Sequence, residues 1–319
     1  MGSRHEAEAA VTDGVGVGGS SVIRYRVTHR TLYRYSDDVT SSYGRGYLTP
    51  RDTDWQRCES SELIVEPEPS DSSTGRDLYG NLSSYFHVTT PHRELSVTAH
   101  SVVDVENPAP PGAGWHQAWE LARPAYGEPT GAAALATEFV LDLATPEITD
   151  EVCDYAAVSF TPGRPLGEAV VDLMGRIYRD FEYRSGSTTI STKVSEVLAA
   201  REGVCQDFAR IAATALRSQG LASRYVSGYL ATNPPPGQAR LVGADATHAW
   251  AAVWVPVDGW VAFDPTNNTV ADERYVTVAW GRDYADVPPL RGIIYTDSES
   301  STIKVSVDVA PCEESPAHA

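Results

Sequence analysis

The pattern that decides the fold is at residues 203–220, which read GVCQDFARIAATALRSQG. Its apolar residues recur at helical spacing, and Gly220 provides a stop; they are Phe208, Ile211, Ala212, Ala215 and Leu216. The pattern predicts an amphipathic helix that starts at or just before Cys205. Unpaired N–H groups and the dipole at a helix start favour a nucleophilic thiolate and could hold an oxyanion. A lone cysteine is more often a small buried apolar residue, so this one needs support from other residues.

That support comes from His248, the only histidine between residue 117 and the C-terminal tail. If Cys205 needs an imidazole from its own part of the chain, His248 is the one candidate. Alone, a histidine at a strand start is more often structural than catalytic.

Asp264 completes the set. The segments HAWAAVWV (248–255) and GWVAFD (259–264) flank a turn-prone Pro-Val-Asp-Gly, which predicts an antiparallel hairpin. With the turn centred on residue 256, His248 lies opposite Asp264, and both share a face with Trp250 and Ala262. A carboxylate there would orient the imidazole and stabilise its cation. Taken alone, Asp264 is a turn aspartate before Pro265.

The first third of the chain shows strand patterns only. Polar and apolar side chains alternate over residues 23–35 and 95–105, with shorter runs at 63–65 and 85–88. We therefore expect an N-terminal all-β sandwich at residues 21–107.

The remaining boundaries follow from composition. A leader occupies 1–20, a Pro/Gly-rich linker 108–130, and a tail 311–319. Helices and strands over 131–310, the segment that carries the candidate catalytic residues, predict a second domain of helices packed on an antiparallel sheet, so the fold class is α+β. Thr145 and Thr192 are expected to cap two of its helices, and a last strand covers 303–309.

Charge and cysteine usage exclude several functions. The chain has 319 residues and a net charge of −18, which disfavours nucleic acid and anionic membrane as partners. Its four cysteines are far apart, without metal-ligand spacing, and the first twenty residues lack the apolar core of a secretory signal. We therefore expect a cytoplasmic protein with reduced thiols, no metal and no cofactor.

Three motifs occur in order: Gly203-Val204-Cys205-Gln206-Asp207-Phe208-Ala209, His248-Ala249-Trp250 and Asp264-Pro265-Thr266-Asn267. Together they resemble the transglutaminase-like superfamily, specifically its bacterial branch, as does Arg224-Tyr225-Val226-Ser227-Gly228-Tyr229 between them. The front part resembles the N-terminal domain of that branch through His29-x-Thr31-x-Tyr33-x-Tyr35, Asp77-Leu78-Tyr79-Gly80-Asn81 and Pro91-His92. The resemblance covers about residues 22–310.

The resemblance implies a papain-like core with Cys205 as nucleophile, His248 as general base and then acid, and Asp264 orienting the histidine. Tyr183 stands roughly where eukaryotic relatives carry a tryptophan that stabilises the transition state, and the Cys205 N–H is the other oxyanion donor. The expected reaction is acyl transfer at amide bonds of a peptide or protein, with hydrolysis ranked first and transamidation second. Two readings rank lower: acyl transfer from a thioester donor, as in arylamine acetyltransferases, and a non-enzymatic binding module on the same fold.

Overall fold

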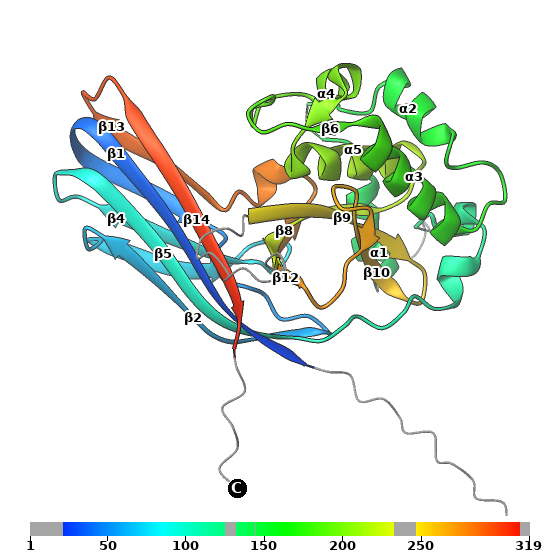
Figure 1. Ribbon diagram of the computed structural model, residues 1–319, viewed down its shortest axis with the longest axis horizontal. Coiled ribbons are helices and arrows are strands. Elements are labelled where there is room, and N and C mark those ends of the chain that lie inside the picture. The colour runs from blue at the N-terminus through cyan, green and yellow to red at the C-terminus, as the bar shows by residue number, and fades with distance from the viewer. Residues whose placement is uncertain (1–21, 125–131, 144, 233–246, 313–319) are drawn as a thin grey trace, which may run out of the picture.

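The computed structural model describes residues 22–124, 132–143, 145–232 and 247–312. The predicted leader lies outside these residues, as does all of the predicted tail except 311–312. An N-terminal sheet of long strands lies against a second unit, in which helices pack on one side of a smaller sheet (Figure 1). Within the described residues, no helix is both long enough and apolar enough to cross a membrane.

The N-terminal sheet is antiparallel and is organised around one long strand. Its strands are β1 (Ile23–Gly46), β2 (Gln56–Glu66), β3 (Asp71–Arg76), β4 (Leu82–Val88), β5 (His92–Val105), β13 (Leu290–Thr296) and β14 (Ser301–Pro311). The first half of β1 pairs with β5 and β14, and its second half pairs with β4 and β13. The sequence predicted a sandwich, but the strands form a single sheet because β1 runs through both of its halves. The sheet curls around an apolar cluster that contains Phe86 and Val88 from β4 and Leu95 and Val97 from β5.

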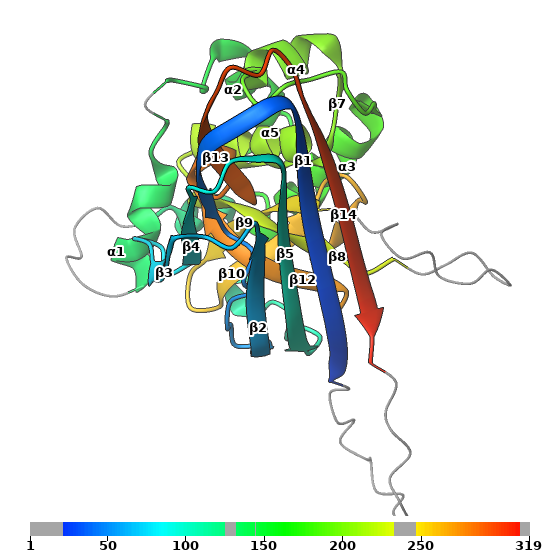
Figure 2. The same ribbon diagram turned by 90° about the vertical axis from the view of Figure 1, so that its left-hand side faces the viewer.

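Strands β13 and β14 correct the predicted domain boundary. Residues 131–310 were expected to form the catalytic domain, but the chain returns after the second sheet and adds two strands to the first. Strand β14 pairs with β1 from Tyr25↔Pro311 to Tyr35↔Ser301 and lies beside it along its length (Figure 2). The alternation at residues 303–309 predicts a strand correctly, but alternation alone does not identify the strand's partner.

The second unit contains the segment that begins at Cys205. Its antiparallel sheet has the order β11-β10-β9-β8-β12, with bounds β8 (Ser223–Leu230), β9 (Thr247–Val255), β10 (Gly259–Asp264), β11 (Thr269–Val270) and β12 (Tyr275–Gly281). The helices are α1 (Ala132–Thr137), α2 (Asp150–Ala157), α3 (Leu166–Asp180), α4 (Val194–Ala200) and α5 (Cys205–Ser218), and β6 (Glu182–Tyr183) pairs with β7 (Glu202–Gly203). Helix α5, predicted from its periodicity, is buried from Asp207 to Arg217, because α2, α3, α4 and β9 surround it.

Short 3₁₀ turns lie between these strands and helices. The segment predicted as a linker contains the 3₁₀ turns η1 (Ala113–His116) and η2 (Trp119–Ala122), and two more are η3 (Glu138–Val140) and η4 (Tyr284–Asp286). Trp119 is buried in the same apolar cluster as α3 and α5. This part of the predicted linker therefore packs as part of the second unit.

Both predicted helix caps are wrong, for local reasons. The Asp142 carboxylate accepts the N–H groups of Glu147 and Ile148, which holds the chain in a loop past Thr145. Helix α2 therefore starts after Thr149, whose side chain accepts the Val152 N–H. The Thr192 hydroxyl accepts the Thr189 N–H instead of capping α4, and Lys193 takes the N-cap position.

The β9–β10 hairpin forms in a register shifted by two residues from the prediction. Val255 pairs with Gly259, so the loop has three residues, with Val257 at φ 71°. His248 therefore lies diagonal to Asp264, which is level with Trp250, instead of directly opposite it. An even shift leaves every side chain on its predicted face, so the shared face is retained.

Two amide side chains of the N-terminal unit cover the edge of β12. Gln56 accepts the Thr277 N–H at 2.7 Å and donates to the Thr277 carbonyl at 2.8 Å. Asn81 pairs in the same way with the backbone of Trp280, at 3.0 and 2.8 Å. Each amide makes the two hydrogen bonds that the backbone of a neighbouring strand would make. The first unit therefore supplies partners for backbone groups at the edge of the second sheet.

We expect Gln56→Leu to lower the free energy of unfolding by about 1–3 kcal/mol, because it leaves the buried Thr277 N–H without an acceptor. Urea denaturation followed by circular dichroism measures the change. Gln117→Leu, at an exposed glutamine, is the control and should change stability little. Equal stabilities for the two variants would show that this amide pairing does not hold the units together.

Candidate active site

Cys205 is the first residue of α5, as the sequence predicts. Its N–H has no acceptor within the helix because the first turn lacks preceding carbonyls. Asp207, almost fully buried, accepts the Val204 N–H at 2.9 Å and the Thr188 hydroxyl at 2.6 Å. A Cβ at Gly203 would lie 3.0 Å from Asp207, so glycine allows this close approach. These contacts fix the backbone that carries the sulfur.

His248, near the start of β9, lies between the sulfur and a carboxylate. Its Nε2 is 2.7 Å from Oδ2 of Asp264, at the end of β10, and the Cys205 sulfur lies close enough for its charge to act on the same ring. Because Nε2 faces Asp264, we assign Nδ1 to the sulfur. The structure thus brings together the three side chains that the sequence singled out.

Asp264 is fully buried, and both of its oxygens are hydrogen-bonded. Oδ2 accepts the Tyr275 hydroxyl at 2.8 Å and the Asn267 amide at 2.6 Å in addition to His248. Oδ1 accepts the backbone N–H of Thr266 at 2.8 Å and that of Asn267 at 3.3 Å. A buried carboxylate with this many donors is held in one orientation and as an anion.

The electrostatics favour a proton on His248. Burial alone would lower its pKa, but the hydrogen bonds and charges of Asp264 and Cys205 raise the pKa to about 10. Burial would raise the pKa of Asp264, but the hydrogen bonds from His248, Asn267 and Tyr275 lower it overall. The folded chain therefore holds the His248 proton more tightly than the unfolded chain does. This contribution to stability is complete below pH about 6.5 and disappears as the pH rises through about 10.

Tyr183, on β6, lies close enough to Cys205 for the sulfur's charge to affect it. Burial and the Cys205 charge together raise the pKa of its hydroxyl. Its ring meets Phe208 edge-on with centroids 6.3 Å apart, and the side chain is 57% exposed. Among the described residues the hydroxyl has no recorded hydrogen bond to the sulfur, so its role in holding an oxyanion stays a prediction.

Three residues of the site were not predicted to have roles. Asn267 and Asp207 lie within the quoted motifs. Asn267 follows Asp264 by three residues and Asp207 follows Cys205 by two, and this closeness is the signal from which a role could have been predicted. Tyr275 lies eleven residues after Asp264 on another strand and has no local signal. Gly228 pairs with His248 across β8 and β9, and a Cβ there would lie 2.6 Å from Trp250 and 2.1 Å from the Val276 carbonyl oxygen.

Over the described residues, no group of three or more His, Cys, Asp or Glu side chains is arranged to hold a metal ion.

The tryptophans Trp250, Trp254 and Trp260 lie on one face of the sheet, as their parity predicts. Trp250 is buried 6.0 Å from His248, and Trp254 meets Trp260 edge-on at 5.7 Å, measured between ring centroids. They form walls of the site and of the core beside it.

We expect Asp264→Asn to slow alkylation of Cys205 by iodoacetamide at neutral pH by about tenfold or more, because it removes the carboxylate that keeps His248 protonated beside the sulfur. Mass spectrometry of digested protein between pH 6 and 9 measures the rate, with Cys153 as internal reference. Tyr275→Phe, which keeps the carboxylate and loses one hydrogen bond, should cause a smaller change. Equal rates at Cys205 in wild type and Asp264→Asn would contradict this account of the site's charge.

The chain is similar to known proteins in both of its units. Residues 25–104 match the bacterial transglutaminase-like N-terminal region, and residues 156–265 match the transglutaminase-like superfamily. An uncharacterised protein of Mycobacterium tuberculosis is 63% identical over 308 residues, which cover 94% of this chain and 96% of that protein. A protein-glutamine gamma-glutamyltransferase of Pseudomonas aeruginosa is 40% identical over 75 residues, 23% of this chain and 11% of that protein.

The fold also has a solved counterpart. A crystal structure described as a candidate cysteine protease from Cytophaga hutchinsonii superposes with a TM-score of 0.70 at 19% identity, covering 93% of this chain and 94% of that chain. At that identity the match concerns the fold alone. Together with the two matched regions, these similarities show that the chain belongs to the transglutaminase-like superfamily and carries the N-terminal region of its bacterial members.

Proposed function

We propose that the protein is a thiol-dependent enzyme that transfers acyl groups from amide bonds, with Cys205 as nucleophile. The observation that carries the proposal is the position of His248 beside the Cys205 sulfur, where its ring is hydrogen-bonded to the buried Asp264. A thiolate beside an imidazolium that a carboxylate orients is the arrangement that thiol acyl transfer uses.

In the proposed reaction the Cys205 sulfur attacks the amide carbonyl and forms a tetrahedral oxyanion. The Cys205 N–H at the start of α5, with Tyr183 as a second donor, stabilises that oxyanion. The intermediate collapses as the C–N bond breaks, and His248 gives its proton to the leaving amine. Water, deprotonated by His248, then attacks the thioester carbonyl. The C–S bond breaks, the carboxylic acid leaves, and the Cys205 thiolate and the His248 imidazolium are restored.

Hydrolysis of peptide or isopeptide bonds is the outcome we favour, since the Cytophaga hutchinsonii structure with this fold is described as a candidate cysteine protease. Transamidation is the alternative, since the Pseudomonas aeruginosa relative is a gamma-glutamyltransferase over a matching segment. Both outcomes pass through the same thioester and differ in the acceptor that reaches it. A non-enzymatic binding module is a third candidate, and the complete Cys-His-Asp set argues against it.

We expect wild-type protein to generate new amino termini in a mixed peptide library, and Cys205→Ala to reduce their rate of formation by about a thousandfold or more. Liquid chromatography with mass spectrometry measures the products. A primary amine in the reaction distinguishes the two outcomes, because transamidation incorporates the amine into the peptides. Identical product profiles for wild type and Cys205→Ala would leave only the binding module.

A further inference from the structure

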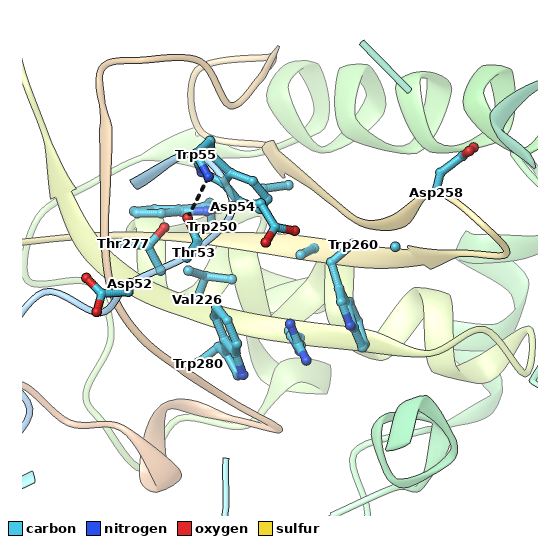
Figure 3. Close-up of a pocket in the computed structure, with 14 residues that line it drawn as sticks. Asp52, Thr53, Asp54, Trp55, Val226, Trp250, Asp258, Trp260, Thr277 and Trp280 are labelled. Atoms are coloured by element: carbon cyan, nitrogen blue, oxygen red, sulfur yellow. Dashed lines mark hydrogen bonds between the residues drawn. The ribbon is translucent and has the colours of Figure 1, made fainter. Parts of the chain in front are cut away.

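A pocket lies on the face of the second sheet that carries His248, under the loop between β1 and β2. Its volume is about 330 Å³, and its walls include Trp55, Trp250, Trp260 and Trp280 (Figure 3). A larger groove of about 1050 Å³ shares Trp55, Trp250 and Trp260 with it and extends to Tyr275. Since the Tyr275 hydroxyl donates to Asp264, the groove borders one of the side chains that hold the carboxylate of the candidate active site.

The pocket contains Arg224, which has no anionic partner among the residues that the structure describes. The Arg224 guanidinium carbon lies 3.8 Å from the ring centroid of Trp260 and 4.1 Å from that of Trp280. Its Nε is buried without an acceptor, and within the described residues no hydrogen bond or ion pair of this side chain is recorded. Burial, together with the nearby Arg51 cation, lowers its pKa. A guanidinium in such surroundings still carries its charge, so a partly desolvated cation faces the pocket.

The pocket's other charges narrow the class of ligand. Three carboxylates also line it, and two of them already accept backbone N–H groups: Asp52 from Cys58, and Asp258 from Gly114. With Asp54 they make the opening unfavourable for phosphate dianions. One planar guanidinium between two indole rings instead matches a single carboxylate, which it can bind through two parallel hydrogen bonds.

The strand register places Arg224 at a defined distance from His248. Arg224 pairs with Ala252, and Gly228 pairs with His248, so four residues of β9 separate the two positions on one face of the sheet. At about 3.4 Å per residue this spans about 14 Å, the length of about four residues of extended peptide. The groove that shares the pocket's walls lies on this same face.

We propose that Arg224 is a specificity determinant that binds a carboxylate of the substrate about four residues away from the amide attacked by Cys205. The assignment rests on the proposed function for its connection to the reaction, but the binding itself does not need catalysis. The carboxylate is either the free C-terminus of a short peptide or an acidic side chain. The stacked tryptophans hold the guanidinium in place and provide apolar surface for the neighbouring residues of the peptide.

Binding to the catalytically blocked Cys205→Ala protein tests the proposal separately from the reaction. The probes are N-acetyl tetra-alanine with a free C-terminus or a terminal amide, and N-acetyl-Ala-Ala-Ala-Glu-amide or its Gln counterpart, with inorganic phosphate as a further probe. Tryptophan fluorescence measures binding, because four tryptophans line the pocket. We expect at least one carboxylate probe to bind about tenfold more tightly than its matched amide, the ratio expected for a charge-assisted pair.

The source of the carboxylate follows from which probe shows the preference. Arg224→Gln in the Cys205→Ala protein should reduce the ratio of carboxylate to amide affinity to about one. Arg224→Lys keeps the charge and the aliphatic stem, but it should lose most of this preference for the carboxylate. Arg123→Gln is the matched control, because Arg123 also stacks on an indole, that of Trp119, outside this pocket. Equal affinities for carboxylate and amide probes up to their solubility limits, a preference that survives both Arg224 variants, or phosphate binding at least as tightly as the carboxylates would each overturn the proposal. None of these outcomes bears on whether Cys205 is catalytic, which the peptide library measures.

Discussion

The hydrogen bond between His248 and the buried Asp264 is the interaction on which the candidate site depends. A carboxylate without solvent would favour its neutral form, and the donors Tyr275, Asn267 and two backbone N–H groups prevent this. Because the anion is retained, His248 holds a proton and a fixed orientation beside Cys205. The sulfur thus has a cation on one side and the first turn of α5 on the other.

The N-terminal sheet contributes more than a neighbouring domain would. Through Gln56 and Asn81 it supplies hydrogen-bonding partners to the edge of β12, and the loop that precedes Gln56 places Asp54 and Trp55 over the sheet face. One apolar cluster combines β1, β5 and β14 with β8, β12 and α5, and the His29 ring is hydrogen-bonded to the Tyr229 hydroxyl across that boundary. The pocket around Arg224 exists only because both units supply walls to it.

Sequence periodicity and motif order predicted the parts of the structure that local chemistry controls. Helix α5, strands β9 and β10, and the shared face of His248 and Asp264 follow from patterns within short segments. Contacts made over long separations could not be predicted in this way. The pairing of β14 with β1, the Tyr275 hydroxyl on Asp264 and the amides of Gln56 and Asn81 on β12 join residues whose separation carries no periodic signal. The hairpin shift had a different cause: the Pro-Val-Asp-Gly turn allows a three-residue loop centred on residue 256 or on residue 257. The structure has the second, with Val257 at φ 71°.

The most direct measurement of the central claim is intact-protein mass spectrometry after rapid acid quenching of the wild-type protein with a peptide library. The account predicts a population with added acyl mass, located on Cys205 by digestion, released by hydroxylamine as a thioester is, and absent from Cys205→Ala. Product formation with the acyl group on a different residue, or undiminished product formation by Cys205→Ala, would contradict it.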